Sequence, residues 1–495
     1  MALPDLIEIV PLDKPVRAEI TVPGSKSITN RALILAALVD GEVTLTGALW
    51  SEDTQVMTEA LRTLGFEVRV EPDPEEFCDR TITVKGRGGK IPNAGTAEKP
   101  LELFVGNAGT AARFLSAMVC SGNGVYHLSG VPRMHERPQA ALFKSLRELG
   151  YRVEAANGNE KLPVRIQGCE PASRRAIRSV LPKLPRSPSI NSRSCAISIA
   201  DSSQFASALL LCAQTGDWTV KIEGKNAEES PYVAMTTKLA EVFPARGGAF
   251  QIEPDASSGS YFWAAGKVAD SPEFREYSER FGGEVTTKLL STVTVAKWPE
   301  SGWQIDERFP TFLNLGAYFH DFLELQRKGI AVDEKSIREV VEQSETAQLS
   351  RKLDLGDSIM TAIVVSGLDH LYWGPLRFTD LGRLRLQECE RVVALRTELS
   401  KCGAKVVEEG DTLTVYPSKL HGAEIETYND HRMAMCFAIL GLKVPGIKLK
   451  NPACVKKTFP NFFQKLAAPP PKGLGAELRD GRTGRKLGMD ELFAD

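Results

Sequence analysis

The sequence predicts an α/β protein of two domains, and two observations lead to this fold class. First, the chain has 495 residues with 42% hydrophobic content, which is enough for two or more domains with sizeable cores. Second, a unit made of a helix, a glycine turn and an alternating strand recurs along the chain. Roughly six such units would fill this length, and they divide between two halves of similar build.

Each copy of the repeat ends its helical segment at a glycine that can adopt the left-handed conformation of a helix C-cap. Leucines or aromatic residues at helical spacing come before the glycine, and a segment with a period of two follows it. Several copies then turn back into a second strand, so the unit resembles a helix followed by a hairpin. The helix-to-strand segments are 60–70, 145–155, 276–287, 398–409 and, more weakly, 239–252; the returning strands are 80–86, 162–168, 291–297 and 411–417.

A domain boundary is expected near residues 253–266, where turn formers and small residues precede a helix. The same segment also suits an ordinary N-cap within a domain. We expect one discontinuous domain of residues 1–22 and 254–468, and a second domain of residues 23–253.

Two segments depart from the repeat and are expected to be solvated appendages without a catalytic role. Residues 305–352 form a polar insertion with a helical pattern. Residues 469–495 begin with a Pro/Gly break and form a charged C-terminal extension.

Composition excludes several classes of function. Lys and Arg number 61 against 63 Asp and Glu, without a long basic stripe, so nucleic-acid binding is not expected. Nine cysteines without a CxxC pair and six histidines without an HExxH motif favour reduced thiols and no metal site. The N-terminal residues do not resemble a signal peptide and no apolar run could span a membrane, so we expect a cytoplasmic protein without a membrane role.

Residues 22–38 place cationic side chains where a Pro-Gly turn leads into an apolar helix. Lys26 lies at the helix start, where free N–H groups and the helix dipole favour an anion. Arg31 follows Ser27 by four residues, on the same helical face, and either Ser25 or Ser27 can cap the helix. A capped helix with solvated cations explains this stretch equally well.

A second candidate is the strand-to-helix turn within residues 103–118, where Asn107 and Gly109 would let a ligand approach the backbone. The turn matches neither a Walker A motif nor a GxGxxG fingerprint, so nucleotide binding is not indicated. A tight turn without a ligand is the alternative. Arg133 and Arg137 come next, and their guanidinium groups suit carboxylate and phosphate ligands.

Further along, Ser202, Ser203 and Gln204 offer uncharged donors at an expected helix start, where a plain helix cap is the alternative. Asp357 precedes an apolar helix either as an N-cap or as a general base.

Three groups of charged residues complete the set. Glu388 and Arg391 lie three residues apart on one helical face, which also fits a surface ion pair. Residues 430–432 place Asp, His and Arg at the start of an apolar segment, and residues 456–457 are a lysine pair of the kind that is usually solvated.

Nine strings in this order resemble the EPSP synthase (3-phosphoshikimate 1-carboxyvinyltransferase) family over residues 8–466. They are PGSKSxxNRALILAAL, GNAGTAxRFL, PRMxERP, SSQFxSALL, DASSxSYF, GDSIMT, TELxKxGAKV, YNDHRMAM and KKTFP. The resemblance implies the two-domain enolpyruvyl transferase fold, with three βαβαββ repeats in each domain and the active site in the interdomain cleft.

The resemblance also implies an activity. The enolpyruvyl group would pass from phosphoenolpyruvate to the 5-hydroxyl of shikimate 3-phosphate, with release of phosphate. Protonation of the methylene carbon, attack of the hydroxyl and collapse of a tetrahedral adduct need acid and base groups in a dry, cationic pocket. The family needs no metal or organic cofactor, and we expect a monomer whose partners are the two small substrates.

Roles for individual residues follow from the resemblance alone. Asp357, facing the 5-hydroxyl, and Glu388, facing the methylene carbon, would be the acid/base pair, with help from Lys26 and His431. The residues expected to bind phosphoenolpyruvate are Lys26, Asn107, Gly109, Arg137, Gln204, Arg391, Arg432 and Lys457. Those expected to bind shikimate 3-phosphate are Lys26, Ser27, Arg31, Ser202, Ser203, Gln204, Ser230, Asp357, Arg383 and Gln387.

The chain departs from the family pattern on the acceptor side. Arg383 and Gln387 replace the Asn and Lys of the family's N-x-R-V-K-E string. Glu229 stands where a phosphate-binding serine is expected, and Ser230 is placed to compensate for it. The donor is therefore better specified than the acceptor.

Two other functions were considered. A carboxyvinyltransferase with a different acceptor fits these replacements, although the chain has PRMHERP where the enzyme for UDP-N-acetylglucosamine would have a cysteine-bearing loop. A non-catalytic anion-binding paralogue predicts the loss of Lys26, Asp357 or Glu388, and all three are present.

Overall fold

The computed structural model divides the chain into two compact units. Unit 1 comprises Met1–Pro23 and Pro254–Asp495, and unit 2 comprises Gly24–Glu253. The structure describes residues 3–156, 158–169, 193–199, 202–224, 231–269, 292–315, 347–368 and 374–494. The expected repeat copy at 276–287 and the central part of the expected insertion lie outside these residues.

Unit 2 is built from short strands and from helices that alternate with them. Its strands are β3 (Asp40–Leu49), β4 (Val68–Pro72), β5 (Asp79–Arg87), β6 (Leu101–Phe104), β7 (Val125–Ser129), β8 (Arg152–Ala155), β9 (Val164–Gln167), β10 (Arg193–Ser198), β11 (Trp218–Glu223) and β12 (Gly248–Gln251). Its helices are α1 (Lys26–Leu38), α2 (Glu52–Thr63), α3 (Gly109–Met118), α4 (Pro132–Glu136), α5 (Ala140–Glu148), α7 (Ser203–Gly216), α8 (Pro231–Val242) and the 3-10 helix η1 (Val119–Ser121).

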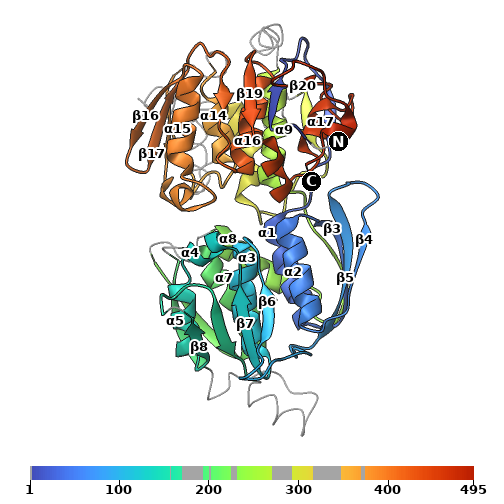
Figure 1. The fold of residues 1–495 in the computed structure, drawn as a ribbon, viewed down its shortest axis with the longest axis vertical. Helices are drawn as coiled ribbons and strands as arrows, with labels where there is room; N and C mark the ends of the chain where they lie inside the picture. The colour runs from blue at the N-terminus through green and yellow to red at the C-terminus, as the bar shows by residue number, and fades with distance from the viewer. Residues whose placement is uncertain are drawn as a thin grey trace, which may run out of the picture. The chain divides into compact units, whose positions relative to one another are not determined.

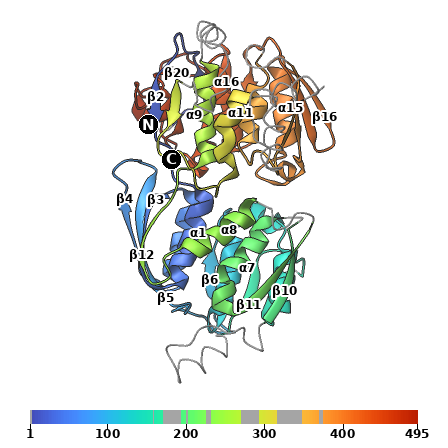
Figure 2. The ribbon, with the colours of Figure 1, turned by 180° about the vertical axis from the view of Figure 1, so that it is seen from behind.

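The sheets of unit 2 share one design. Their strand orders are β12-β3-β5-β4, β6-β7-β9-β8 and β10-β11. In the two larger sheets a parallel pair is extended by two antiparallel strands, and the segment from β6 to β9 follows the order βαβαββ. Figure 2 shows α1, α7 and α8 between the β12-β3-β5-β4 sheet and the β10-β11 pair.

Helices α1, α3 and α7 contact one another inside unit 2 and are buried on nearly all faces. In α1 every residue from Ile28 to Leu38 is buried. A helix that is apolar all round belongs in a core, and the ALILAAL run of α1 meets this requirement. The central helices therefore hold the first turns of α1, α3 and α7 at defined positions.

Unit 1 has the same kind of elements. Its strands are β1 (Leu6–Ile9), β2 (Ala18–Ile20), β13 (Val293–Val295), β14 (Ala347–Ser350), β15 (Leu376–Thr379), β16 (Lys405–Glu409), β17 (Thr412–Tyr416), β18 (Glu424–Ile425), β19 (Ile447–Lys450) and β20 (Leu478–Asp480). Its helices are α9 (Ala256–Val268), α11 (Phe309–Leu315), α14 (Ile359–Val365), α15 (Arg391–Lys401), α16 (His431–Gly441) and α17 (Phe462–Ala467), with 3-10 helices η2 (Ile305–Arg308), η4 (Gly382–Leu386), η5 (Pro452–Lys457) and η6 (Met489–Glu491).

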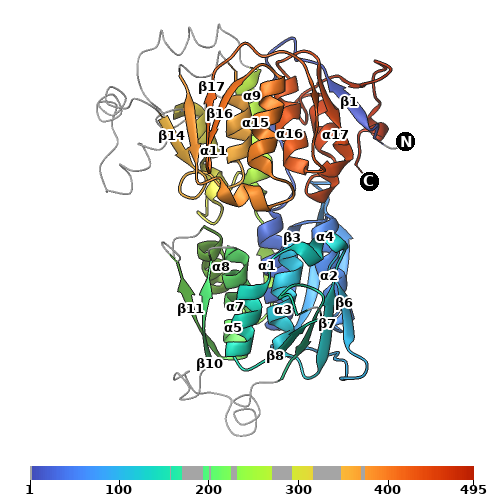
Figure 3. The ribbon, with the colours of Figure 1, turned by 60° about the vertical axis from the view of Figure 1, so that its left-hand side comes forward.

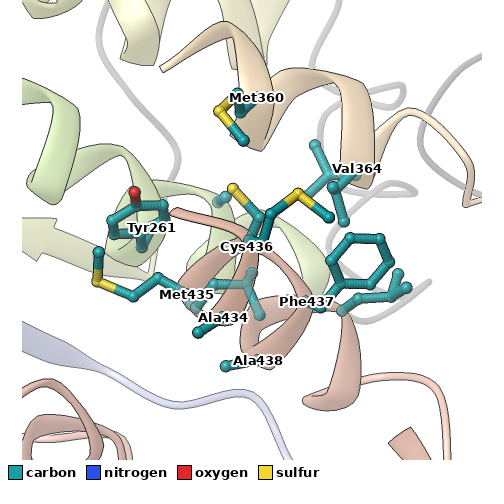
Figure 4. Close-up of a cluster of buried hydrophobic side chains, with 14 of the residues drawn as sticks. Tyr261, Met360, Val364, Ala434, Met435, Cys436, Phe437 and Ala438 are labelled. Carbon is teal, nitrogen blue, oxygen red and sulfur yellow. The ribbon is translucent and has the colours of Figure 1, made fainter. Parts of the chain in front are cut away.

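Among its described residues, unit 1 also has three sheets around a helical core. Their strand orders are β18-β19-β1-β20, β13-β2 and β14-β15-β17-β16. Figure 1 shows α9, α14 and α16 in the middle of the unit, and α15 packs on β16 (Figure 3). Tyr261 of α9, Met360 and Val364 of α14, and residues 434–438 of α16 form one buried apolar cluster (Figure 4).

The repeat predicted from the sequence is confirmed where the chain is described. Gly65, Gly150 and Gly403 follow α2, α5 and α15 with φ of 89°, 87° and 92°, the left-handed conformation that favours glycine. Each is followed by a hairpin: β4–β5, β8–β9 or β16–β17. The weaker copy differs, because its strand β12 pairs in parallel with β3 and forms no hairpin.

The C-terminal residues correct the expectation of a solvated extension. Strand β20 pairs antiparallel with β1, placing Leu478 opposite Ile9. Leu474, Leu487 and Leu492 are buried with Leu478 in the core of unit 1. With β20, the sheet β18-β19-β1-β20 repeats the design of β6-β7-β9-β8. The sequence pattern missed this role because these leucines are isolated among polar residues and show no periodicity.

The ends of the expected insertion also belong to the fold. Residues 305–315 form η2 and α11, and Phe309 and Phe312 are buried in the core of unit 1. At the other end, β14 pairs in parallel with β15. These two ends are therefore not solvated appendages.

We expect Leu478→Ala to lower the free energy of unfolding by about 2–4 kcal/mol, because the removed side chain leaves a cavity in the core. Leu478 is 1% exposed. Met489 lies in the same C-terminal segment and is 44% exposed, so Met489→Ala is the matched control, with an expected change below about 0.5 kcal/mol. Urea denaturation measures both, and equally small losses would contradict the packed C-terminus.

Candidate active site

Asp357 lies between two arginines in unit 1. Its Oδ1 is 2.6 Å from Nη2 of Arg351, and its Oδ2 is 3.1 Å from Nη2 of Arg432. All three side chains are largely buried. Burial by itself would raise the pKa of Asp357, but the Arg432 and Arg351 guanidiniums hold that pKa well below its usual range. The carboxylate is therefore ionised throughout the neutral range.

The N-cap alternative for Asp357 is wrong. The N-cap residue of α14 is Ser358, and the side chain of Asp357 forms no cap. The carboxylate that accepts hydrogen bonds at this helix start belongs to Asp306, which binds the N–H groups of Gly356 and Ser358, each at 2.9 Å. The side chain of Asp357 is thus available for ionic contacts rather than for capping.

A second cluster in unit 1 centres on Arg391, which is 1% exposed. Its Nε is 2.6 Å from Oδ2 of Asp430, and its Nη2 is 2.7 Å from Oε2 of Glu388. Its Nη1 donates to Oε1 of Gln387. Lys457 Nζ lies 2.9 Å from the other oxygen of Glu388. The surface ion pair and the solvated lysine are therefore wrong interpretations of Glu388, Arg391 and Lys457.

The start of α16 joins these two clusters. Asp430 is the N-cap of α16 and accepts a hydrogen bond from the N–H of Arg432 at 2.9 Å. His431 is buried beside it, with Nδ1 3.8 Å from Oδ1 of Asp430. Cations and carboxylates consequently follow one another through unit 1, in the order Arg351, Asp357, Arg432, Asp430, Arg391, Glu388 and Lys457. Arg432 and Asp430 are joined through the backbone N–H of Arg432, and the other links are ion pairs.

In unit 2, Lys26 lies on the first turn of α1, as the sequence predicted. Its Nζ is 3.2 Å from Oδ2 of Asp53, a buried residue of the first turn of α2. The side chain of Ser25 forms no cap hydrogen bond, although Ser25 occupies the N-cap position. Asp53 was not among the expected site residues, and its only signal in the sequence was its place two residues after Ser51, the N-cap of α2.

Arg31 is held by oxygen atoms of the protein within unit 2. It is 2% exposed, and its guanidinium donates to Thr236 Oγ1 at 2.8 Å, Ser27 O at 2.8 Å and Ser207 Oγ at 3.0 Å. Burial lowers the pKa of Arg31 to about 10. In this structure Arg31 links α1, α7 and α8, because burial leaves protein oxygens as its acceptors, and acceptor binding by Arg31 stays a prediction.

Two guanidiniums approach the start of α3. A Cβ atom added to Gly109 would lie 2.5 Å from Nη1 of Arg113 and 2.7 Å from Nη1 of Arg137. Arg113 donates to Oε1 of Gln204 at 2.9 Å, and Arg137 donates to the carbonyl of Asn107 at 3.3 Å. The structure thus brings Asn107, Gly109, Arg137 and Gln204 together, and it adds Arg113, which the sequence analysis missed.

The side-chain oxygen of Asn107 is buried and accepts no hydrogen bond from the described residues. A buried oxygen without a donor is costly, and it lies on a turn lined with cationic side chains. This placement fits a ligand-binding turn better than a turn with a purely structural role.

The remaining expected residues have different environments. Ser202 is the N-cap of α7, and its side chain accepts a hydrogen bond from the N–H of Gln204 at 3.3 Å; acceptor binding by Ser202 stays a prediction. Ser203 is buried, and Ser27 is partly exposed on α1. Arg383 lies half-buried on η4. Ser230 and Glu229 lie outside the described residues.

The described part of the chain contains neither a cluster suited to a metal ion nor a helix suited to a membrane. There, His, Cys, Asp and Glu residues form no group of three or more that could hold a metal ion. None of the helices described has the length and apolar character needed to cross a lipid bilayer.

The buried pairing of Arg391 gives a stability prediction. We expect Arg391→Met to lower the free energy of unfolding by about 3–5 kcal/mol, because it leaves buried carboxylates without their cation. Arg133 pairs with Glu136 at the same three-residue spacing, with both side chains exposed. Arg133→Met is therefore the matched control, with an expected loss below about 1 kcal/mol. If urea denaturation gave similar small losses for both, the buried cluster would be refuted.

Known proteins are similar to this chain in sequence and in fold. The sequence profile of the EPSP synthase (3-phosphoshikimate 1-carboxyvinyltransferase) family matches residues 11–247 and 321–466. The 3-phosphoshikimate 1-carboxyvinyltransferase of Trichormus variabilis is 34% identical over 484 residues, covering 93% of this chain and 98% of the relative. The protein of the same name from Opitutus terrae is 34% identical over 494 residues, covering 94% and 98%.

Solved structures agree on the fold. EPSP synthase from Acinetobacter baumannii has a TM-score of 0.62 at 19% identity, covering 93% of this chain and 97% of that one. The enolpyruvyl transferase NikO from Streptomyces tendae has a TM-score of 0.57 at 16% identity, covering 97% and 99%. The predicted two-domain α/β enolpyruvyl transferase fold is confirmed. The chain belongs to the EPSP synthase (3-phosphoshikimate 1-carboxyvinyltransferase) family.

Proposed function

We propose that this chain transfers the enolpyruvyl group of phosphoenolpyruvate to the 5-hydroxyl of shikimate 3-phosphate and releases phosphate. The observation that supports this proposal most strongly is the row of alternating charges in unit 1. It holds two carboxylates suited to proton transfer, Asp357 and Glu388, in contact with arginine and lysine side chains suited to anion binding.

The proposed chemistry is a series of proton transfers between the two carboxylates and the substrates. Glu388 delivers a proton to the methylene carbon, and the substrate hydroxyl then attacks the cationic carbon while Asp357 takes the hydroxyl proton. The tetrahedral adduct next loses phosphate, which carries away the proton held by Asp357, while Glu388 takes back a proton from the methyl group and the double bond is restored. Lys26 and His431 assist these steps, and no step needs a metal or an organic cofactor.

Asp357 needs a change of partners to act as a base. With both guanidiniums in contact, its lowered pKa makes it a weak proton acceptor. We propose that Arg432 moves to the phosphoenolpyruvate anion when that substrate binds. The loss of one cation would raise the pKa of Asp357 and make the carboxylate a better base.

Each unit would contribute part of the binding site. We propose that Arg391, Arg432 and Lys457 of unit 1 bind phosphoenolpyruvate together with Lys26, Arg137, Gln204, Gly109 and Asn107 of unit 2. The acceptor would contact Ser27, Arg31, Ser202, Ser203 and Ser230 together with Arg383. An interdomain site, a monomeric state and a cytoplasmic location are parts of the same proposal.

A different acceptor is the second candidate. Gln387 stands where the family string has a lysine, and its side-chain oxygen accepts a hydrogen bond from Arg391. A lysine has no acceptor for this contact. This residue therefore supports Arg391 from within unit 1, which favours an altered set of contacts to the acceptor.

Phosphate release from phosphoenolpyruvate tests the proposal. We expect turnover with shikimate 3-phosphate, and none with UDP-N-acetylglucosamine or without an acceptor. Mass spectrometry of the product should show the added enolpyruvyl group. Turnover with UDP-N-acetylglucosamine alone would favour the second candidate, and no turnover with either compound would contradict the proposed reaction.

We expect Asp357→Asn and Lys26→Met each to lower kcat by at least about a hundredfold, as for the loss of an acid/base or charge-stabilising group. Lys352→Gln is the control for loss of a positive charge, because Lys352 is exposed. Steady-state kinetics at saturating substrate measures all three variants. Near-normal rates for Asp357→Asn or Lys26→Met would refute the assigned role.

A further inference from the structure

The two ends of the segment 305–352 both reach the immediate surroundings of Asp357. Asp306 lies on η2, at the start of the segment. Arg351 follows β14, at its end. The sequence assigned this segment no part in catalysis, because it interrupts the repeat. Its ends nevertheless converge on the residue proposed as the base.

Asp306 holds the backbone on both sides of Asp357. Its Oδ1 accepts hydrogen bonds from the N–H groups of Gly356 and Ser358, each at 2.9 Å. The hydroxyl of Ser358 donates to the same oxygen, and that of Ser257 on α9 donates to Oδ2 at 2.6 Å. Asp306 is 5% exposed, so these donors replace the water that a carboxylate would otherwise bind.

The glycine before Asp357 belongs to the same arrangement. A Cβ atom added to Gly356 would lie 2.7 Å from Oδ2 of Asp306. Only glycine therefore lets the buried carboxylate approach the loop this closely. The backbone of Asp357 is thus held in place by the carboxylate of Asp306, which binds the amides of Gly356 and Ser358 on either side of it.

Arg351 binds the side-chain carboxylate of Asp357. The N–H of Arg351 donates to the carbonyl of Thr379 at 3.1 Å, which continues the β14–β15 pairing beyond the strand. Its side chain is 9% exposed and contacts Oδ1 of Asp357, whereas Arg432 contacts Oδ2. The two guanidiniums occupy different oxygens, so Arg432 can leave without displacing Arg351.

We propose that Arg351 and Asp306 are positioning residues for Asp357, and that Arg351 keeps this carboxylate paired and oriented while Arg432 binds substrate. The inference rests on the proposed function, in which Asp357 is the base and Arg432 binds phosphoenolpyruvate. A buried carboxylate without a counterion is strongly disfavoured. The retained Arg351 contact supplies that counterion through the reaction.

A double-mutant cycle in kcat tests the role of Arg351. We expect Arg351→Gln to lower kcat at least about tenfold with less than about a threefold change in KM for phosphoenolpyruvate, because Arg351 acts through Asp357 rather than on the substrate. In the Asp357→Asn background the same substitution should change kcat by less than about twofold. Equal losses in both backgrounds would overturn the proposal.

Conservative variants distinguish a positioning role of Arg351 and Asp306 from a general loss of folded protein. Arg351→Lys keeps a cation and should recover part of the lost kcat, whereas Lys352→Gln, which removes the neighbouring exposed charge, should match the wild type. Asp306→Asn keeps an oxygen for the Gly356 and Ser358 donors and should stay close to wild type, while Asp306→Ala should lose kcat at least about tenfold. Equal rates for Asp306→Asn and Asp306→Ala would overturn the assignment of Asp306.

A double-mutant cycle in urea denaturation tests whether Arg351 and Asp357 interact, without any measurement of turnover. We expect Arg351→Gln to lower the urea midpoint of the wild type more than that of Asp357→Asn, because the second protein no longer contains the buried carboxylate. Equal shifts would overturn the pairing. A wild type without turnover would contradict the proposed function, and this cycle would still decide whether Arg351 and Asp357 interact.

Discussion

The burial of alternating charges in unit 1 is the constraint on which the rest of the site depends. Arg391 and Asp430 are almost fully buried. The free-energy cost of removing an ion from water is offset only when its ion-pair partners are well positioned. The chain meets this requirement with Glu388 between η4 and α15, Arg391 of α15, Asp430 at the N-cap of α16 and Lys457 of η5. The apolar faces of α15 and α16 pack in the core of unit 1. The charged side chains and the core therefore depend on each other. The core holds the ion-pair partners at fixed positions, and a shift of those positions would leave buried charges unpaired.

The repeated sheet design explains how residues far apart in sequence reach one site within each unit. In both units the helices at the centre are buried nearly all round, and several side chains of the site lie on their first turns. Lys26 begins α1, Gly109 begins α3 and His431 begins α16. Helix starts provide free N–H groups and a favourable dipole for anions. A fold of this design can thus collect cationic side chains and helix N-termini without a long binding loop.

The sequence was least informative where a residue's role depends on a partner far along the chain. Asp306 and Arg351 lie at the two ends of a polar segment that interrupts the repeat, and nothing in their neighbours indicates that both contact the surroundings of Asp357. Arg113 lies within α3 and Asp53 on the first turn of α2, and they are recognised only through their contacts with Gln204 and Lys26. The leucines of the C-terminal segment were missed for a related reason. This segment contributes one short strand to the sheet, so its sequence does not show the helix-to-hairpin repeat.

The sequence by itself determined the repeat, the division into two halves and most of the charged motifs, because helix caps, glycine turns and hydrophobic periodicity are local properties. Only the tertiary structure decided which of those charges are buried and with which partner. It turned a presumed surface pair into the Arg391–Asp430–Glu388 cluster and gave Asp357 two arginines instead of a cap. Desolvation and pairing are set by everything that surrounds a group, and no local stretch of chain contains that information.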